Sequence, residues 1–235
     1  MAGVPENTLQ AFEYAAEAGA AALEVDVRWT QDGQMVVLHD SILDRTTRCT
    51  GPVEAITYAA LRSCATAAEV PTFATTLRFA RDHQLMINPE VKPVADSPLT
   101  DDQARAYVEQ INHHAMAERS VVSSRSTEVL ALIKQQPGAT GLRFSAITGT
   151  RGALTPARAR AQGTVYMPDH TTLTEQSVAD FHEAGVEIWA WPARSPADYA
   201  AMVALGVDVI VADDPKQAVA YLAREDGSGR SEPPL

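Results

Sequence analysis

Hydrophobic and polar positions along this chain follow two periods, one typical of strands and one typical of helices. Short apolar runs predict strands at residues 21–28, 35–39, 85–91, 120–123, 141–144, 163–167, 186–191 and 207–212. Between them, apolar residues recur at helical spacing in segments that begin near Asn7, Phe73, Asp101, Ser126, Thr155, Thr174, Ser195 and Pro215. This alternation of strand and helix predicts an α/β fold built on a mainly parallel sheet.

Two segments depart from the alternation. Residues 41–70 carry few periodic apolar positions and come directly after a strand, so they predict an insertion at a strand end. Residues 224–235 are mainly Gly, Ser, Pro and charged residues, which favours a disordered tail. We therefore expect a single barrel-like domain over residues 1–223 that contains the insertion.

Composition narrows the classes of partner. The chain has 235 residues, of which 46% are hydrophobic, and a formal net charge of -11 that disfavours nucleic acid or anionic lipid as a general partner. No apolar run reaches the roughly 18 residues of a membrane helix. We expect no integral membrane segment and a cytoplasmic location as the sequence stands, although a start further upstream would be able to add a signal peptide.

The two cysteines lie outside any recognisable metal or redox motif. Cys49 and Cys64 do not have the spacing of a CxxC motif, and no histidine lies near them in the sequence. A disulfide between them is one interpretation, and we expect instead that both are reduced.

The segment Leu23-Glu24-Val25-Asp26-Val27 is the first candidate for chemistry. Strand alternation places Glu24 and Asp26 on one face, with Cα atoms about 6.6 Å apart. In a parallel barrel this face points to the interior, where unpaired charges are costly and a divalent cation such as Mg²⁺ or Ca²⁺ would stabilise them. A simpler interpretation is an ion pair of either carboxylate with Arg28.

A second strand carries a similar pattern. In Ile87-Asn88-Pro89-Glu90-Val91-Lys92, the side chains of Asn88, Glu90 and Lys92 share one face. Glu90 would be a third carboxylate ligand, and Lys92 would contact a phosphate oxygen or a carboxylate. A plain pair between Glu90 and Lys92 is the alternative. Pro89 removes a ladder donor, which predicts an irregularity in the sheet there.

A histidine and two tryptophans complete the set of candidates. His39 ends the apolar strand at 35–39 and is placed to transfer a proton near neutral pH. Trp189 and Trp191 lie near a later strand end, where aromatic residues line substrate pockets or belong to the core.

These residues together resemble the glycerophosphodiester phosphodiesterase family. The resemblance rests on the following motifs: Pro5-Glu6-Asn7-Thr8, Glu24-Val25-Asp26, Asp32-Gly33, His39-Asp40, Leu43-Asp44-Arg45-Thr46-Thr47 and Gly51. Looser agreement continues through Pro71-Thr72-Phe73, Asn88 to Lys92, Ser124, Trp189 and Asp213-Asp214-Pro215, so the resemblance covers nearly the whole chain.

The resemblance implies a fold and an activity. The fold would be a (β/α)₈ TIM barrel with a small insertion after the second strand, and the activity would be metal-dependent hydrolysis of glycerophosphodiesters to glycerol 3-phosphate and an alcohol. It also implies roles for single residues: Glu24, Asp26 and Glu90 as ligands of Mg²⁺ or Ca²⁺, His39 as a catalytic residue, and Lys92 and Trp189 as contacts to a small-molecule glycerophosphodiester.

One family motif is not found in the sequence. The family carries His-Arg-Gly on its first strand, shortly before Pro-Glu-Asn-Thr, and this chain has no His-Arg pair. We expect the first strand to be missing and diesterase activity to be impaired, with a true start further upstream favoured over a genuine truncation or a strand supplied by a partner. The alternative function is a degenerate, non-catalytic barrel that binds a metal or phosphate ligand or is purely structural. A metal-dependent aldolase or sugar-phosphate barrel would not explain the run from His39 to Thr47.

Overall fold

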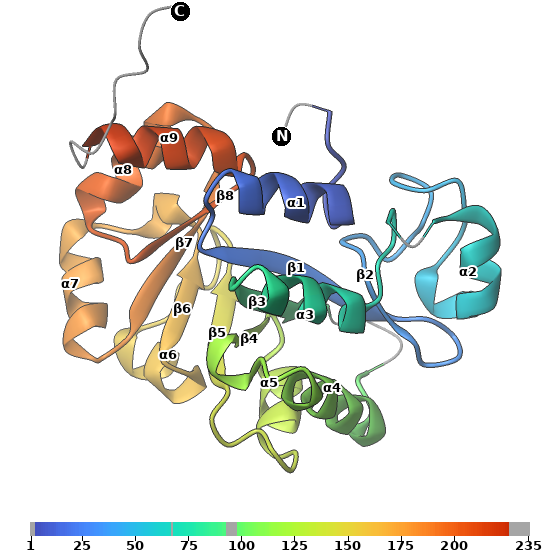
Figure 1. Cartoon of the computed structure of the whole chain (residues 1–235). Helices are drawn as coiled ribbons and strands as arrows, with labels where there is room; N and C mark the ends of the chain where they lie inside the picture. The colour runs from blue at the N-terminus through green and yellow to red at the C-terminus, as the bar shows by residue number, and fades with distance from the viewer. Residues whose placement is uncertain (1–2, 67, 93–97, 226–235) are drawn as a thin grey trace, which may run out of the picture.

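The fold is an α/β sheet that curls towards a barrel with helices on its outer side (Figure 1). The computed structural model describes residues 3–66, 68–92 and 98–225. Its strands are β1 (Ala22–Trp29), β2 (Met35–Val37), β3 (Met86–Val91), β4 (Val121–Ser124), β5 (Arg143–Thr148), β6 (Val165–Pro168), β7 (Glu187–Ala193) and β8 (Val209–Ala212). Its α-helices are α1 (Leu9–Glu17), α2 (Tyr58–Cys64), α3 (Phe73–Asp82), α4 (Asp101–His113), α5 (Thr127–Lys134), α6 (Pro156–Gln162), α7 (Glu175–Glu183), α8 (Pro196–Leu205) and α9 (Pro215–Glu225).

The strand order is β2-β1-β3-β4-β5-β6-β7-β8. Every neighbouring pair from β1 to β8 is parallel, and β2 alone pairs in the antiparallel direction, with β1. β2 lies within the strand predicted at residues 35–39. Among the described residues, no pairing joins β8 to β1, so the curled sheet keeps two ends.

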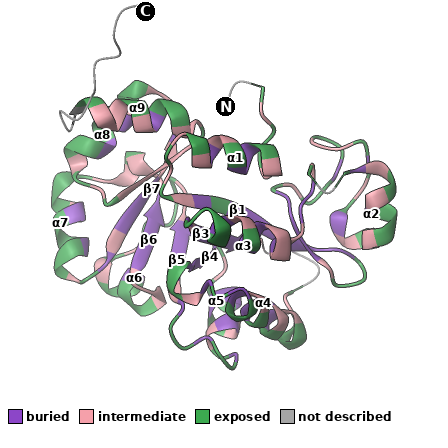
Figure 2. Cartoon of the chain, in the orientation of Figure 1, coloured by how far each residue is buried: buried purple, intermediate pink, exposed green. Residues whose placement is uncertain are grey.

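The parallel strands from β3 to β6 are almost entirely buried (Figure 2). On β1, Leu23, Val25 and Val27 are buried in the same core cluster as Phe12 of α1 and Phe73 of α3. Glu24 and Asp26 therefore face the interior of the curled sheet, as the strand alternation predicts.

The predicted helix starts agree closely with the structure because capping residues fix them. Thr8, Ser126, Thr155, Thr174 and Ser195 are N-caps whose side chains accept a hydrogen bond from a backbone N–H in the first turn. Some strands begin later than predicted. Gly141, expected to open a strand, has a φ of 114° and belongs to the preceding turn, so β5 starts at Arg143. At the other end, α9 continues to Glu225, and residues 226–235 of the predicted tail lie outside the described residues.

The segment between β2 and α3 packs around a small core of its own. It contains α2 and a short 3-10 helix, η1 (Val53–Ala55), beside the sheet in Figure 1. Its buried members are Val36, Leu38, Leu43, Cys49, Val53, Leu61, Ala65 and Val70. These contacts follow no single helical or strand period, which is why the sequence pattern shows little structure there.

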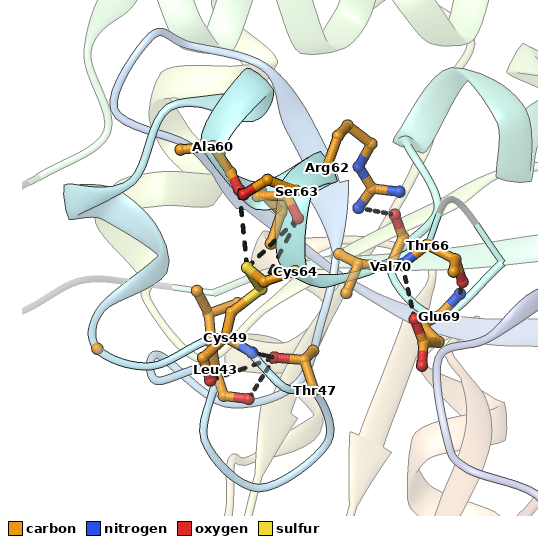
Figure 3. Close-up of a disulfide and its surroundings, with 12 residues drawn as sticks. Leu43, Thr47, Cys49, Ala60, Arg62, Ser63, Cys64, Thr66, Glu69 and Val70 are labelled. Carbon is orange, nitrogen blue, oxygen red and sulfur yellow. Dashed lines mark hydrogen bonds between the residues drawn. A yellow bond between two sulfur atoms is a disulfide. The ribbon is translucent and has the colours of Figure 1, made fainter.

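The expectation of reduced cysteines is wrong. Cys49 and Cys64 form a disulfide, with their Cα atoms 5.2 Å apart (Figure 3). Thr47 turns the chain at this point, because its hydroxyl donates to the Leu43 carbonyl and accepts the Cys49 N–H. The turn brings Cys49 against the end of α2, where Cys64 lies.

The irregularity predicted at Pro89 lies on one side of β3 only. Pro89 pairs in register with Val25 of β1, but towards β4 the ladder is reduced to Glu90 with Ser123 and an isolated bridge between Ile87 and Ser120. The Asn88 amide spans this gap by donating to the Val121 carbonyl at 2.5 Å and to the Ser123 hydroxyl at 3.0 Å. A side chain thus supplies donors where the proline ring removes one.

Within the described part of the chain, no helix is both long and apolar enough to cross a bilayer.

Candidate active site

The carboxyl ends of the parallel strands surround an open hollow of about 540 Å³. We refer to it below as the hollow. Polar and charged residues in its wall are Glu6, Asn7, Glu24, Asp26, His39, Glu90, Lys92, Arg125, Arg194 and Asp213. Loops and side chains at this end of a parallel barrel are where such folds place ligand sites.

Three carboxylates converge in the hollow, as the strand patterns predict. One oxygen each of Glu24, Asp26 and Glu90 lies within 4.8 Å of the others. The parallel pairing explains the convergence, because Asp26 of β1 stands opposite Glu90 of β3 in the ladder. Lys92 extends between them, with Nζ 2.8 Å from Asp26 Oδ1 and 2.8 Å from Glu90 Oε2.

The charged groups of the cluster shift one another's pKa values. Glu24 remains accessible to solvent within the hollow, yet desolvation by the surrounding protein and repulsion from Asp26 and Glu90 raise the pKa of its carboxyl well above its usual range. The repulsion follows directly from the short distances between the carboxylate oxygens. Burial likewise raises the pKa of Glu90 despite the attraction of Lys92. Burial opposes the charge on Lys92, but Asp26 and Glu90 outweigh it and raise the pKa of the ammonium group.

The residues of the cluster fit a divalent cation. The Glu90 side chain is only 5% exposed. Its Oε1 atom is buried and has no hydrogen-bond partner in the described part of the chain. A buried carboxylate oxygen without a partner is costly, and coordination to a hard cation would remove that cost. Glu24, Asp26 and Glu90 are the residues that would hold the cation.

Asn7 is a site residue to which the sequence patterns assign no role in the site. Thr8 caps α1, and Asn7 instead grips the backbone and side chain of Asp26. Asn7 Nδ2 donates to Asp26 Oδ2 at 2.7 Å, and Asn7 Oδ1 accepts the Asp26 N–H at 3.2 Å. Asn7 has a φ of 56°, a left-handed conformation that asparagine tolerates better than most residues. The sequence feature that could have indicated this role is the position of Asn7 in the motif Pro-Glu-Asn-Thr.

Arg28 contacts the His39 backbone and Glu54 and not the carboxylates of Glu24 and Asp26. Its Nε and Nη2 donate to the backbone carbonyl of His39 at 3.1 and 2.9 Å, and its Nη1 lies 3.2 Å from Glu54 Oε1. The predicted alternative of a pair between Arg28 and Glu24 or Asp26 is therefore wrong. The guanidinium group of Arg28 instead holds the backbone of the His39 segment.

His39 lies in the wall of the hollow, and its ring is oriented by its neighbour. His39 Nδ1 is 2.9 Å from Asp40 Oδ1. Asp40 in turn bonds Arg45 Nε, and Arg45 also pairs with Glu6. These contacts with Arg45 and His39 lower the pKa of Asp40 to about 2. Because the ionised carboxylate only accepts, Nδ1 carries the proton and Nε2 is left to exchange a proton with a ligand.

The two tryptophans of β7 have different surroundings. Trp189 is 3% exposed and packs in a core cluster with Val121, Val165 and Met167, so the structure does not bring it into the wall of the hollow. Trp191, two residues further along the strand, does line the hollow. A substrate contact by Trp189 stays a prediction.

The fold and the acidic cluster define a class: a parallel α/β barrel-type protein with a candidate metal site at the strand ends. The sequence model of the glycerophosphoryl diester phosphodiesterase family matches residues 2–217. The chain belongs to this family.

Individual relatives agree with that membership. A glycerophosphodiester phosphodiesterase of Caldanaerobacter subterraneus is 27% identical over 95% of this chain and 94% of its own. One of Bacillus altitudinis is 31% identical over 92% and 91%. Among solved structures, an Oleispira antarctica phosphodiesterase in complex with the product sn-glycerol-3-phosphate superimposes with a TM-score of 0.83. It is 21% identical and covers 93% of this chain and 91% of its own, so this likeness concerns the fold.

Proposed function

We propose that this chain binds a divalent cation, Mg²⁺ or Ca²⁺, and hydrolyses glycerophosphodiesters to glycerol 3-phosphate and an alcohol. The observation that carries the proposal is the convergence of Glu24, Asp26 and Glu90 with Lys92 and His39 in one hollow. The family membership and the product bound to the Oleispira antarctica relative support the choice of substrate.

The chain's own residues supply binding and proton transfer. Glu24, Asp26 and Glu90 would hold the cation, which when bound places positive charge against the phosphoryl oxygens. Lys92 pairs with the carboxylates of Asp26 and Glu90 and would add a positive charge next to the phosphoryl group of a bound substrate. His39, with Nδ1 fixed by Asp40, would protonate the departing alkoxide through Nε2.

We further propose that the chain of 235 residues turns over slowly. The sequence contains no His-Arg-Gly motif, and His39 is the single histidine in the wall of the hollow within the described residues. A missing acid-base group costs about 10² to 10⁴ in rate. Binding of the cation and of a phosphate ligand would remain.

A non-catalytic barrel is the second candidate function. Lys92 already neutralises part of the acidic cluster, as a structural ion-pair network would require. The two candidates differ in the role of Glu24, which lies in the hollow beside the other carboxylates and is solvent accessible.

The test is an assay of glycerophosphocholine hydrolysis in the presence of Mg²⁺ or Ca²⁺, in which the glycerol 3-phosphate released is measured. We expect slow hydrolysis that stops with a chelator and is lost in Glu24→Gln and His39→Gln, while Glu187→Gln, outside the hollow, retains it. Cation-dependent hydrolysis at full enzymatic rates would contradict the proposed slow turnover but would support the diesterase function. Hydrolysis that is absent from the wild type, or unchanged in Glu24→Gln, would favour the non-catalytic barrel.

A further inference from the structure

Arg125, which directly follows β4, brings a guanidinium group into the wall of the hollow. Its side chain is 45% exposed. Cζ lies 4.8 Å from the centroid of the Trp191 ring, within the range of a cation–π contact. The ring is itself held, because Trp191 Nε1 donates to the Met167 carbonyl at 3.0 Å. Trp191 thus keeps the guanidinium beside the acidic cluster and accessible to a ligand.

The charge of Arg125 is not matched by a close ion pair with Glu90. Arg125 Nε is 3.9 Å from Glu90 Oε1, which is beyond hydrogen-bond distance. Glu90 Oε1 has no hydrogen-bond partner in the described residues, while Glu90 Oε2 is bonded to Lys92. A cation that coordinates Oε1 would compensate Glu90 and leave Arg125 without its negative neighbour.

The charges in the loaded hollow then favour an anion beside Arg125. Glu24, Asp26 and Glu90 carry three negative charges, which a divalent cation and Lys92 would balance. Arg125 remains as an additional positive charge, and a phosphodiester carries one negative charge. The planar guanidinium presents parallel N–H donors that fit two phosphoryl oxygens at once.

Another arginine in the wall is placed differently. Arg194 Nε is 3.3 Å from Asp213 Oδ2, and the Arg194 side chain is 68% exposed. Its charge is therefore matched by a carboxylate at the rim. This contrast makes Arg194 a suitable control for Arg125.

We propose that Arg125 binds the phosphoryl group of the ligand, as a substrate-binding residue stacked on Trp191. The proposal rests on the proposed function, since it places the phosphoryl group next to the cation held by the three carboxylates. It assigns phosphate recognition to a residue at the end of β4 that the sequence motifs do not include.

Isothermal titration calorimetry tests it in two stages, with Mg²⁺ first and then sn-glycerol 3-phosphate added to the Mg²⁺-saturated protein. In Arg125→Met we expect Mg²⁺ to bind as tightly as in the wild type or more tightly, since a neighbouring positive charge is removed. Affinity for sn-glycerol 3-phosphate should fall about ten- to a hundredfold, as expected for lost charge-assisted hydrogen bonds. Arg125→Lys should retain part of the affinity, and Arg194→Met should keep most of it.

Inorganic phosphate serves as a second probe, and we expect the same loss in Arg125→Met because the contact is to phosphoryl oxygens. Equal affinity of wild type and Arg125→Met for both probes would overturn the role of Arg125 and leave the proposed function intact. A wild-type protein that does not bind Mg²⁺ would contradict the proposed function, and the role of Arg125 would fail with it.

Discussion

Asp26 illustrates how much of the site depends on single contacts. Strand alternation is sufficient to predict that Asp26 and Glu24 share a face, because that property is local. The partners of Asp26 are not local: Asn7 reaches it from before α1, and Lys92 from the end of β3. The contact with Asn7 also requires a left-handed backbone conformation, which no periodic pattern indicates. The sequence therefore predicts the placement of the acidic side chains better than it predicts the residues that orient them.

Replacing Asn7 should weaken cation binding without removing a ligand. Asn7→Ala loses the hydrogen bonds to the side chain and backbone of Asp26. We expect cation affinity to fall about ten- to a hundredfold, the usual effect of losing a residue that orients a ligand. Calorimetric titration with Ca²⁺ measures it, with a substitution of the exposed Gln10 in the first turn of α1, Gln10→Ala, as control. Equal affinities of Asn7→Ala and the control would show that Asn7 does not orient Asp26.

Asp40 should titrate far below an ordinary aspartate. Arg45 and His39 lower its pKa from 3.8 to about 2. Because the pKa is lowered in the folded state, these contacts stabilise the protein above the unfolded pKa, and the stabilisation is lost as the pH falls through about 2. Carboxyl ¹³C chemical shifts would show Asp40 still ionised at pH values where ordinary aspartates are protonated, and Arg45→Met should move the midpoint back towards 3.8. A wild-type midpoint near 3.8 would be inconsistent with the arrangement of these residues.

At the scale of elements, the strands and helices of the barrel follow the predicted order because each has a simple local cause. Continuous apolar runs such as β6 mark strands covered on both faces, and residues such as Ser195 with Pro196 mark helix starts. The segment between β2 and α3 lacks such signals. Its small core joins Val36, Leu43 and Leu61 with a disulfide, and these contacts arise only after the chain has folded back on itself.

The disulfide should stabilise this segment. The bond between Cys49 and Cys64 closes a loop with a sequence separation of 15, for which the chain-entropy estimate is about 3 kcal/mol. We expect the Cys49→Ala, Cys64→Ala double variant to lose a free energy of unfolding of that order in urea titrations, and reduction of the wild type to have a similar effect. Equal unfolding free energies of the oxidised wild type and the double variant would contradict this role. Disulfides persist in oxidising compartments, and the cytoplasmic location expected from the sequence remains a prediction.

At the scale of the whole molecule, the curled parallel sheet brings charged side chains from several strands to one hollow. Glu24 and Asp26 come from β1, Glu90 from β3, and Arg125 and Trp191 from the ends of β4 and β7. The family resemblance pointed to the three carboxylates and to His39, which the fold brings into one hollow, and their roles as metal ligands and catalytic residue stay predictions. The proposed role of Arg125 could not be predicted from the sequence, because it depends on contacts with Trp191 and Glu90 that form only in the folded chain.

The central claim is that Glu24, Asp26 and Glu90 form one site for a divalent cation. Calorimetric titration of the metal-free protein with Ca²⁺ tests it most directly. The prediction is one bound cation per chain in the wild type, with affinity at least about tenfold weaker in Glu90→Gln, which removes a charge from the buried cluster. Glu183→Gln, on α7 and outside the hollow, should bind as the wild type does. No binding by the wild type, or equal binding by Glu90→Gln, would contradict the claim.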